Sequence, residues 1–196
     1  MSFSVTKRLA LAGVSRGIRL PENPVNRYGE LLRLRALLDE LEINCVIDAG
    51  ANTGQFASEL RAAGFGGHLV SFEPVERSFR ALQDGLGEDP LWSGHRLALG
   101  DEDTRLKINV TPQMTVMSSF LAPRGDAFEV VEEEVEVRRL DGIFAEVTSQ
   151  IADPRVFLKM DTQGFDLKVF AGAAGCLERI RGLQSELSVI PVYEGM

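Results

Sequence analysis

A stretch of nine residues, 46–54, constrains the fold of this chain more than any other feature. It reads Val-Ile-Asp-Ala-Gly-Ala-Asn-Thr-Gly, an apolar run that ends in an acidic residue and continues into a glycine turn. A helical pattern begins directly after Gly54. A buried strand that leads through a tight glycine turn into a helix is typical of open α/β sheets that hold nucleotide-like ligands. We therefore expect a ligand-binding strand–turn–helix unit at this point.

The rest of the chain alternates between short apolar runs and segments with helical spacing of apolar residues. Strands are expected at Cys45–Ala49, His68–Glu73, Arg96–Leu99, Val156–Met160 and Leu183–Ile190. Helices are expected at Asn26–Leu41, Gln55–Ala63, Glu76–Leu86, Leu140–Val147, Asp166–Ala171 and Ala173–Ile180. Because strands that alternate with helices form right-handed parallel layers, the pattern predicts an α/β fold with a doubly wound, mostly parallel sheet. Ligands in such sheets lie beyond the carboxyl ends of the strands, where the strand order reverses.

The middle and the end of the chain are less regular. Arg105–Val110 and Glu134–Leu140 alternate apolar and charged residues, which predicts two strands with one solvent-facing side. The segment between them, Met114–Arg124, is expected to be a loop. Few residues follow the last expected strand, so the sheet is expected to lack its final strands. The edge left bare is open to the N-terminal helix or to a second copy in a homodimer.

Charge is distributed unevenly between the two expected parts of the chain, an N-terminal basic extension with its helix (1–42) and a main domain (43–196). The formal net charge of −8 argues against nucleic acid as the main partner. Residues 1–35, in contrast, carry seven Lys or Arg and two Glu. The apolar patch near the N-terminus is too short for a signal peptide. Two interpretations remain open, a peripheral contact with an anionic membrane and an extension that frays or packs on the protein.

The chain has two cysteines, Cys45 and Cys176, and two histidines. The cysteines lie far apart and in different expected elements, which favours reduced, partly buried thiols and a cytoplasmic location. No cluster of Cys and His has the spacing of a zinc site, so no metal site is expected.

The residues of the glycine turn indicate the kind of cofactor. Gly50 and Gly54 permit positive backbone φ angles and close approach, and Asn52 is the non-glycine residue that best tolerates the left-handed region. A dinucleotide site needs a third glycine that makes room for a pyrophosphate, whereas this chain has Phe56 there. A cofactor without phosphates, S-adenosyl-L-methionine, therefore fits better. Its expected contacts are Asp48, Gly50, Ala51, Asn52, Thr53 and Gly54.

Acidic residues also close two later strands. Glu73 follows the second strand, where a carboxylate can accept both hydroxyl groups of a ribose, and Pro74 is expected to lie against the purine ring. Asp161 closes the strand Val156–Met160 and is expected to project into the cleft or to cap the helix that follows. Lys159, two residues before it, needs a buried partner or a route to solvent.

Taken together, the motifs of residues 43–196 resemble those of the FkbM-type S-adenosylmethionine-dependent methyltransferases. The Lys-Met-Asp-x-x-Gly-x-Asp block narrows the resemblance from methyltransferases with this sheet in general to this family. In chain order the matching segments are VIDAGANTGQFA, VSFEP, RLALGD, MSSFL, VRRLDGIF, FLKMDTQGFDLKVFAGA and ELSVIPVYEG.

The resemblance implies a role for several residues. The turn residues Asp48, Gly50, Asn52 and Gly54 would line the methionine end of the cofactor, Glu73 the ribose, and Ala98 and Leu99 the adenine. Many members have Glu where this chain has Gln163, and members usually extend beyond Gly195, so this chain is expected to be shortened at its C-terminus.

The family is associated with O-methylation of hydroxyl groups on sugars, glycolipids and polyketide-type natural products, so the expected partner is a small-molecule or glycolipid acceptor. The hydroxyl oxygen would attack the sulfonium methyl in line while a base removes its proton. Asp161 is the first candidate for the base and His95 the second. Ser118, Ser119 and Tyr193 are candidate substrate contacts.

Two other functions remain open. One is a truncated, non-catalytic methyltransferase-like domain that only binds cofactor or a partner protein. The other is a nicotinamide-dependent oxidoreductase, which the missing third glycine disfavours. A nucleic-acid methyltransferase is disfavoured because no Asn/Asp-Pro-Pro-aromatic block follows the strand Val156–Met160.

Overall fold

The computed structural model describes residues 24–111, 118–121 and 130–186, with the side chains of residues 24–27 left out. Several expectations therefore lie outside the described residues. These are the basic segment at the N-terminus with its membrane contact, most of the expected loop Met114–Arg124, the second half of the expected strand Leu183–Ile190, and Tyr193.

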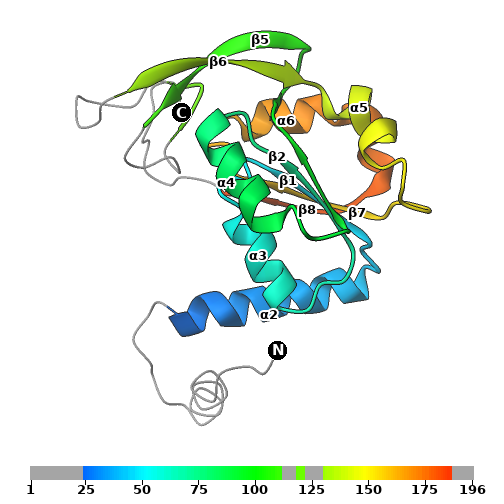
Figure 1. Ribbon diagram of the computed structural model, residues 1–196. Helices are drawn as coiled ribbons and strands as arrows, with labels where there is room; N and C mark the ends of the chain where they lie inside the picture. The colour runs from blue at the N-terminus through cyan, green and yellow to red at the C-terminus, as the bar shows by residue number, and fades with distance from the viewer. Residues whose placement is uncertain (1–23, 112–117, 122–129, 187–196) are drawn as a thin grey trace.

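The centre of the molecule is a five-stranded sheet in which all neighbouring strands are parallel (Figure 1). The strand order is β3-β2-β1-β7-β8, so the order reverses between β1 and β7. This reversal is the place where open α/β sheets bind their ligands. The strands are β1 (Cys45–Ala49), β2 (His68–Phe72), β3 (Trp92–His95), β7 (Val156–Met160) and β8 (Ile180–Ser185).

Strand β1 is the most deeply buried element because it lies between β2 and β7 and has helices on both of its faces. All five of its residues are buried, which explains the nearly continuous apolar sequence Cys-Val-Ile-Asp-Ala. Asp48 is the exception, and it lies beside Lys159 of β7 in the parallel register.

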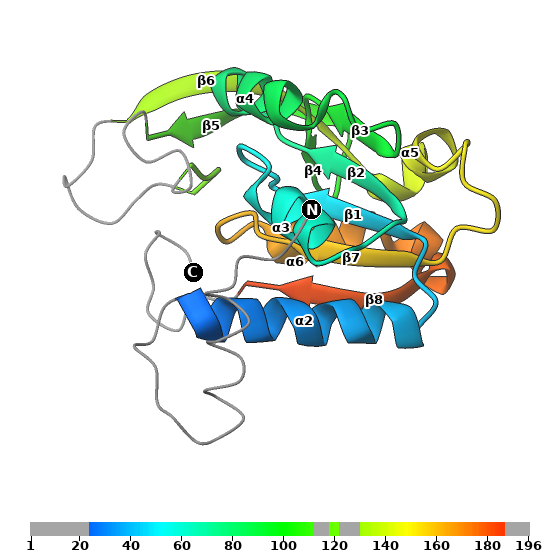
Figure 2. The ribbon, with the colours of Figure 1, turned by 60° about the horizontal axis from the view of Figure 1, so that its bottom comes forward.

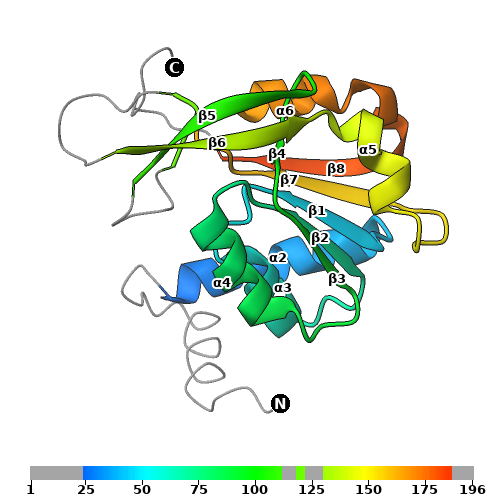
Figure 3. The ribbon, with the colours of Figure 1, turned by 45° about the horizontal axis from the view of Figure 1, so that its top comes forward.

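Helices cover both faces of the sheet, as expected for a doubly wound fold (Figure 3). One face packs against α2 (Pro24–Glu40), α3 (Gln55–Ala62) and α4 (Glu76–Leu86), whose apolar stripes meet the sheet through Leu38, Leu60 and Leu82. The other face packs against α5 (Leu140–Val147), α6 (Asp166–Gly172) and the 3₁₀ helix η2 (Ala174–Arg179). The prediction of a mostly parallel α/β fold is confirmed.

A second, three-stranded sheet has the order β4-β6-β5 and lies beside α4 and α6 (Figure 1). Its strands are β4 (Ala98–Leu99), β5 (Thr104–Val110) and β6 (Val131–Arg138). The ion pairs Arg105–Glu134 and Lys107–Glu132 lie on its exposed side, while Ile108 and Val135 are buried. This confirms the expected pair of strands with one solvent-facing side.

The expected strand Arg96–Leu99 was wrong in its position. The third strand of the central sheet is β3, Trp92–His95, and residues 98–99 belong to the second sheet. The reason is that β3 is an edge strand with no fully buried residue, so it lacks the apolar run that marks an interior strand. Trp92 at the start of β3 contacts the neighbouring strand β2, where its Nε1 donates a hydrogen bond to Ser71 Oγ at 3.1 Å.

The other edge of the sheet, β8, begins earlier than expected and ends at Ser185. Helix α2 runs alongside it, as Figure 2 shows, and a Cβ atom at Gly182 would lie 3.3 Å from Leu41 just after that helix. The helical segment expected at Ala173–Ile180 is the 3₁₀ helix η2.

Candidate functional site

The carboxyl ends of β1 and β7 meet directly at the point where the strand order reverses. The backbone N–H of Asp161 donates to the carbonyl of Ala49 at 3.0 Å, which ties the two strand ends together. Gly50 follows with φ of 78°, and a Cβ atom there would lie only 2.1 Å from the carbonyl oxygen of Asp161. Glycine is therefore required at position 50 by the protein's own backbone.

The remainder of the turn has the backbone conformations expected from the sequence. Asn52 has φ of 48° and Gly54 has φ of 85°, both in the left-handed region. The N–H groups of Gly50 and Ala51 both donate to the carbonyl of Phe72 at 3.0 Å, so the turn is fastened to the end of β2. Ala51 and Gly54 are buried, whereas Thr53 is exposed.

Glu73 lies directly across this turn at the carboxyl end of β2. Its carboxylate accepts hydrogen bonds from the N–H of Asn52 at 2.8 Å and from the N–H of Val75 at 2.9 Å. Its residue surface is only 6% exposed, and burial raises the pKa of Glu73 to about 7 although the two backbone donors oppose this rise. Pro74, next in sequence, is half-buried. Glu73, the residue predicted to bind the ribose, is therefore hydrogen-bonded to the glycine turn.

Asp48 is a buried carboxylate that is paired with a buried lysine. It is 1% exposed, so its charge depends on the groups packed around it. Lys159 Nζ lies 2.9 Å from Asp48 Oδ1 and supplies a charge. Burial raises the pKa of Asp48, and the charge of Lys159 offsets only part of that effect. The charge of Asp48 is thus compensated only in part by the protein's own residues.

Lys159 connects Asp48 to Asp161. Its ammonium group lies 3.5 Å from Asp161 Oδ2 and 5.3 Å from the centre of the Phe56 ring. Burial opposes the charge on Lys159, but the two carboxylates outweigh this effect and raise its pKa above the ordinary value. Asp161 also accepts a hydrogen bond from Gln163 Nε2 at 2.9 Å. The buried partner that Lys159 was expected to need is therefore present.

Two acidic residues near this cluster were given no role from the sequence, although Asp166 ends the Lys-Met-Asp-x-x-Gly-x-Asp block. Glu186 follows β8, and its N–H donates to the carbonyl of Met160 at 3.1 Å. The negative charge of Asp161 raises the pKa of Glu186. Asp166 accepts from the N–H of Thr162 at 2.9 Å and from Ser185 Oγ at 2.6 Å, so Asp166 fastens the loop before α6. The alternative reading of Asp161 as the helix cap is wrong, because α6 begins at Asp166.

His95 lies away from this cluster. In the parallel register His95 is paired with Phe72, whereas Ser71 is paired with Asp48, and successive residues of a strand point to opposite faces. His95 therefore projects from the face opposite to Asp48, where its ring stacks on Phe72 with centroids 5.0 Å apart. Its buried Nε2 has no hydrogen-bond partner among the described residues, and burial lowers the pKa of His95.

The remaining candidates have mixed surroundings. Ser119 donates from Oγ to the carbonyl of Gln163 at 2.7 Å and accepts from the N–H of Leu121 at 3.0 Å, so its hydroxyl holds the loop that carries Asp161. Ser118 Oγ is buried without a hydrogen-bond partner in the described part of the chain. Ala98 and Leu99 are both buried. Their assignment to adenine remains a prediction.

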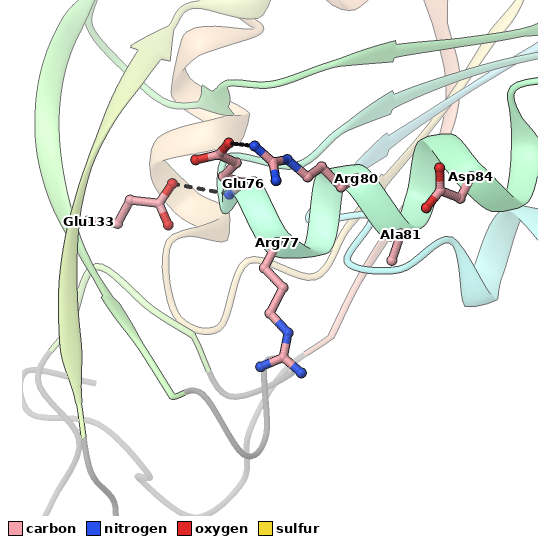
Figure 4. Close-up of a pocket in the computed structure, with 6 residues that line it drawn as sticks. All are labelled: Glu76, Arg77, Arg80, Ala81, Asp84 and Glu133. Atoms are coloured by element: carbon pink, nitrogen blue, oxygen red, sulfur yellow. Dashed lines mark hydrogen bonds and ion pairs between the residues drawn. The ribbon is translucent and has the colours of Figure 1, made fainter.

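A separate open pocket of about 500 Å³ lies on the outer side of α4 (Figure 4). Its lining consists of Glu76, Arg77, Arg80, Ala81, Asp84 and Glu133. None of the candidate residues belongs to it. Glu133 of β6 accepts the N–H of Glu76 at 3.0 Å and so caps the first turn of α4.

The residues of the central site fit S-adenosylmethionine in charge and donor set. Asp48 offers negative charge to an ammonium group, and the Glu73 carboxylate retains lone pairs that can accept ribose hydroxyls. Phe56 is half-buried on the first turn of α3, in the place where a dinucleotide site has glycine.

Such a sheet, with a buried acid before a glycine turn at the reversal of strand order, is consistent with the Rossmann-like fold of methyltransferases. The family described as "Methyltransferase FkbM domain" matches residues 48–194. Since the match spans most of the chain, this protein belongs to the FkbM methyltransferase family, as the motifs predicted.

A curated relative is consistent with this membership. The 2-O-methyltransferase NoeI of Sinorhizobium fredii (strain NBRC 101917 / NGR234) is 24% identical over 191 residues, which cover 91% of this chain and 76% of NoeI. The family and this distant relative together support methyltransferase activity.

Two further findings concern membranes and metals. Among the described helices, none combines the length and apolar character needed to cross a bilayer. Over the same residues, no group of three or more His, Cys, Asp or Glu side chains could hold a metal ion.

Cys45 and Cys176 are both buried and unpaired, and burial raises their pKa values to about 12 and about 11.

Proposed function

We propose that this protein is an S-adenosylmethionine-dependent O-methyltransferase. The observation that carries the proposal is Asp48, a buried carboxylate at the reversal of strand order whose charge is compensated only in part by Lys159. Burying a charged group in a protein interior is costly, so its place beside the glycine turn favours a cationic ligand. The ammonium group of the methionine moiety has the matching charge and donors.

Different residues of the site would bind the cofactor and accept the proton. Asp48 and the turn that starts at Gly50 would hold the methionine end, and Glu73 would accept the ribose hydroxyls. When bound, the cofactor supplies an electrophilic methyl group on a positively charged sulfur. Asp161 would accept the proton of the acceptor hydroxyl, while Gln163 and Lys159 orient its carboxylate and stabilise its negative charge.

The acceptor is proposed to be a hydroxyl of a sugar, a glycolipid or a polyketide-type natural product. The printed name of the relative NoeI, a 2-O-methyltransferase, supports oxygen as the methyl acceptor.

Calorimetry with S-adenosylhomocysteine and with NAD tests the cofactor assignment. We expect binding of S-adenosylhomocysteine and none of NAD, and at least tenfold weaker binding by Asp48→Asn because the ammonium group loses its charged partner. Tight binding of NAD alone would reject the proposal in favour of an oxidoreductase.

Transfer of a labelled methyl group to a panel of hydroxylated glycolipids and polyketides tests the reaction. The Asp161→Asn variant is expected to lower transfer by about 10²–10⁴-fold, the usual contribution of a general base. Its affinity for S-adenosylhomocysteine should stay within a few-fold of wild type. Near-normal turnover by this variant would reject Asp161 as the base.

The alternative of a non-catalytic domain predicts a different combination of results. Such a domain would bind S-adenosylhomocysteine with the same dependence on Asp48 but would methylate none of the acceptors.

A further inference from the structure

A short segment of the chain, residues 118–121, links the second sheet to the loop that follows β7. Ser119 pairs with Asn109 of β5 in an antiparallel bridge, through two backbone hydrogen bonds of 2.9 and 3.0 Å. On the side of the loop, the rings of Phe120 and Phe165 lie with their centroids 4.5 Å apart. The segment is therefore fastened to β5 and packs against the loop.

The hydroxyl group of Ser119 lies inside this link. The residue is only 1% exposed. Its Oγ donates to the carbonyl of Gln163 at 2.7 Å and accepts a hydrogen bond from the N–H of Leu121 at 3.0 Å. Because a serine hydroxyl has one hydrogen to donate, the donor capacity of Ser119 is used on the loop.

Gln163 continues the link from Ser119 to Asp161. Its backbone has φ of 52°, in the left-handed region that residues with a Cβ atom adopt only at a cost. Its carbonyl accepts from Ser119, and its Nε2 donates to Asp161 Oδ1 at 2.9 Å. The hydrogen bond from Ser119 thus supports the backbone conformation in which the amide of Gln163 reaches the carboxylate.

We propose that Ser119 is a positioning residue for methyl transfer and acts on Asp161 through Gln163. This inference rests on the proposed function, in which Asp161 accepts the proton of the acceptor hydroxyl. A base has to lie within hydrogen-bond distance of that proton, and a small displacement of a catalytic group lowers the rate strongly. Ser119 therefore has a role different from the substrate contact expected from the sequence.

The side-chain amide signals of Gln163 in ¹⁵N–¹H NMR spectra test this link without acceptor or cofactor. Gln163→Ala identifies the signals by removing them, and Asp161→Ala shows how they move when the hydrogen bond to the carboxylate is lost. Ser119→Ala is expected to move them in the same direction as Asp161→Ala. The exposed Gln83 on α4 should keep its signals in both of these variants.

The kinetics of methyl transfer give a second readout. Ser119→Ala should lower kcat by about tenfold, less than loss of the base itself, and should leave KM for S-adenosylmethionine within about twofold of wild type. Because Ser119 acts through Gln163, the double variant Ser119→Ala/Gln163→Ala should be no slower than Gln163→Ala alone.

Thr148→Val is the matched control for the loss of a buried hydrogen bond. Thr148 Oγ1 donates to the carbonyl of Phe144 at 2.7 Å at the end of α5, so this variant loses a bond of the same kind and length as Ser119→Ala. Its urea midpoint should fall by a similar amount, whereas its kcat should equal that of wild type.

Unmoved Gln163 signals in Ser119→Ala would overturn the inference, and so would effects of the two substitutions on kcat that multiply in the double variant. An equal loss of kcat in Thr148→Val would also overturn it, because a general loss of stability would then be the cause. If wild type binds no S-adenosylhomocysteine and transfers no methyl group, the proposed function fails, and the NMR signals alone decide whether Ser119 holds Gln163 on Asp161.

Discussion

The buried carboxyl of Glu73 should make the stability of this protein depend on pH in a way that a single substitution removes. Burial raises the pKa of Glu73 from 4.5 to about 7 in the folded protein. In the unfolded chain the group regains its ordinary pKa. Between these two values the folded state binds more protons than the unfolded state, so the free energy of unfolding falls as the pH rises.

The expected magnitude follows from the difference between the two pKa values. The gap between 4.5 and about 7 corresponds to about 3 kcal/mol, which is fully present below pH 4.5 and lost by the time the pH passes 7. In Glu73→Gln the side chain cannot titrate. The difference in unfolding free energy between wild type and this variant should therefore fall by about 3 kcal/mol over that range and stay constant outside it.

Urea denaturation at a series of pH values measures this difference, with the fluorescence of Trp92, the single tryptophan, as the signal. Other titrating groups are present in both proteins and cancel in the comparison. Glu88→Gln, an exposed change just after α4, is the matched control and should show a constant difference. A difference for Glu73→Gln that varies by less than about 0.5 kcal/mol between pH 4.5 and 7.5 would refute the reasoning.

Two further predictions concern the glycine turn and the buried ion pair beside it. Gly50→Ala should destabilise the fold by more than about 3 kcal/mol, because it combines a left-handed backbone with a clash against the Asp161 carbonyl. Gly85→Ala, at an open position on α4, should instead stabilise the fold by about 0.5–1 kcal/mol. Equal changes in the free energy of unfolding for the two variants, measured by denaturation, would contradict the requirement for glycine at position 50. Lys159→Met should cost about 3–5 kcal/mol because it leaves Asp48 buried and uncompensated. Adding Asp48→Asn to it should restore most of that loss, and simple additivity in the double-mutant cycle would show that the two groups do not interact.

Much of the fold could be predicted because its interior elements have strong periodicity. The bounds of β1, β7, α4 and α5 agree with the expected ranges, since each of these elements buries a continuous run or a clear helical stripe. The error at β3 has the opposite cause. This edge strand buries little surface, and because residues 97 and 99 are apolar, the strand was expected four residues too far along the chain.

The strand errors had consequences for the site. With β3 misplaced, His95 fell outside any expected strand, and its pairing with Phe72 on the far face of the sheet could not be read from the sequence. With the last strand expected at Leu183–Ile190, Glu186 fell in the middle of a strand. In the structure β8 ends at Ser185, which places Glu186 at the carboxyl end beside Asp161. Strand ends, more than strand existence, decide which residues can reach a ligand.

The glycine turn and the acid before it carry different kinds of information about function. Gly50 is required because the Asp161 carbonyl lies where its side chain would be, and Gly54 is required because Leu82 and Leu86 lie within about 3 Å of the corresponding point. Both glycines would therefore be needed in a protein that binds nothing. Asp48 is explained only in part by the fold, because burial raises its pKa although Lys159 lies beside it, and a cationic ligand would offset the remainder. The acid, together with its link through Lys159 to Asp161, is thus the stronger argument for a cationic cofactor at this site.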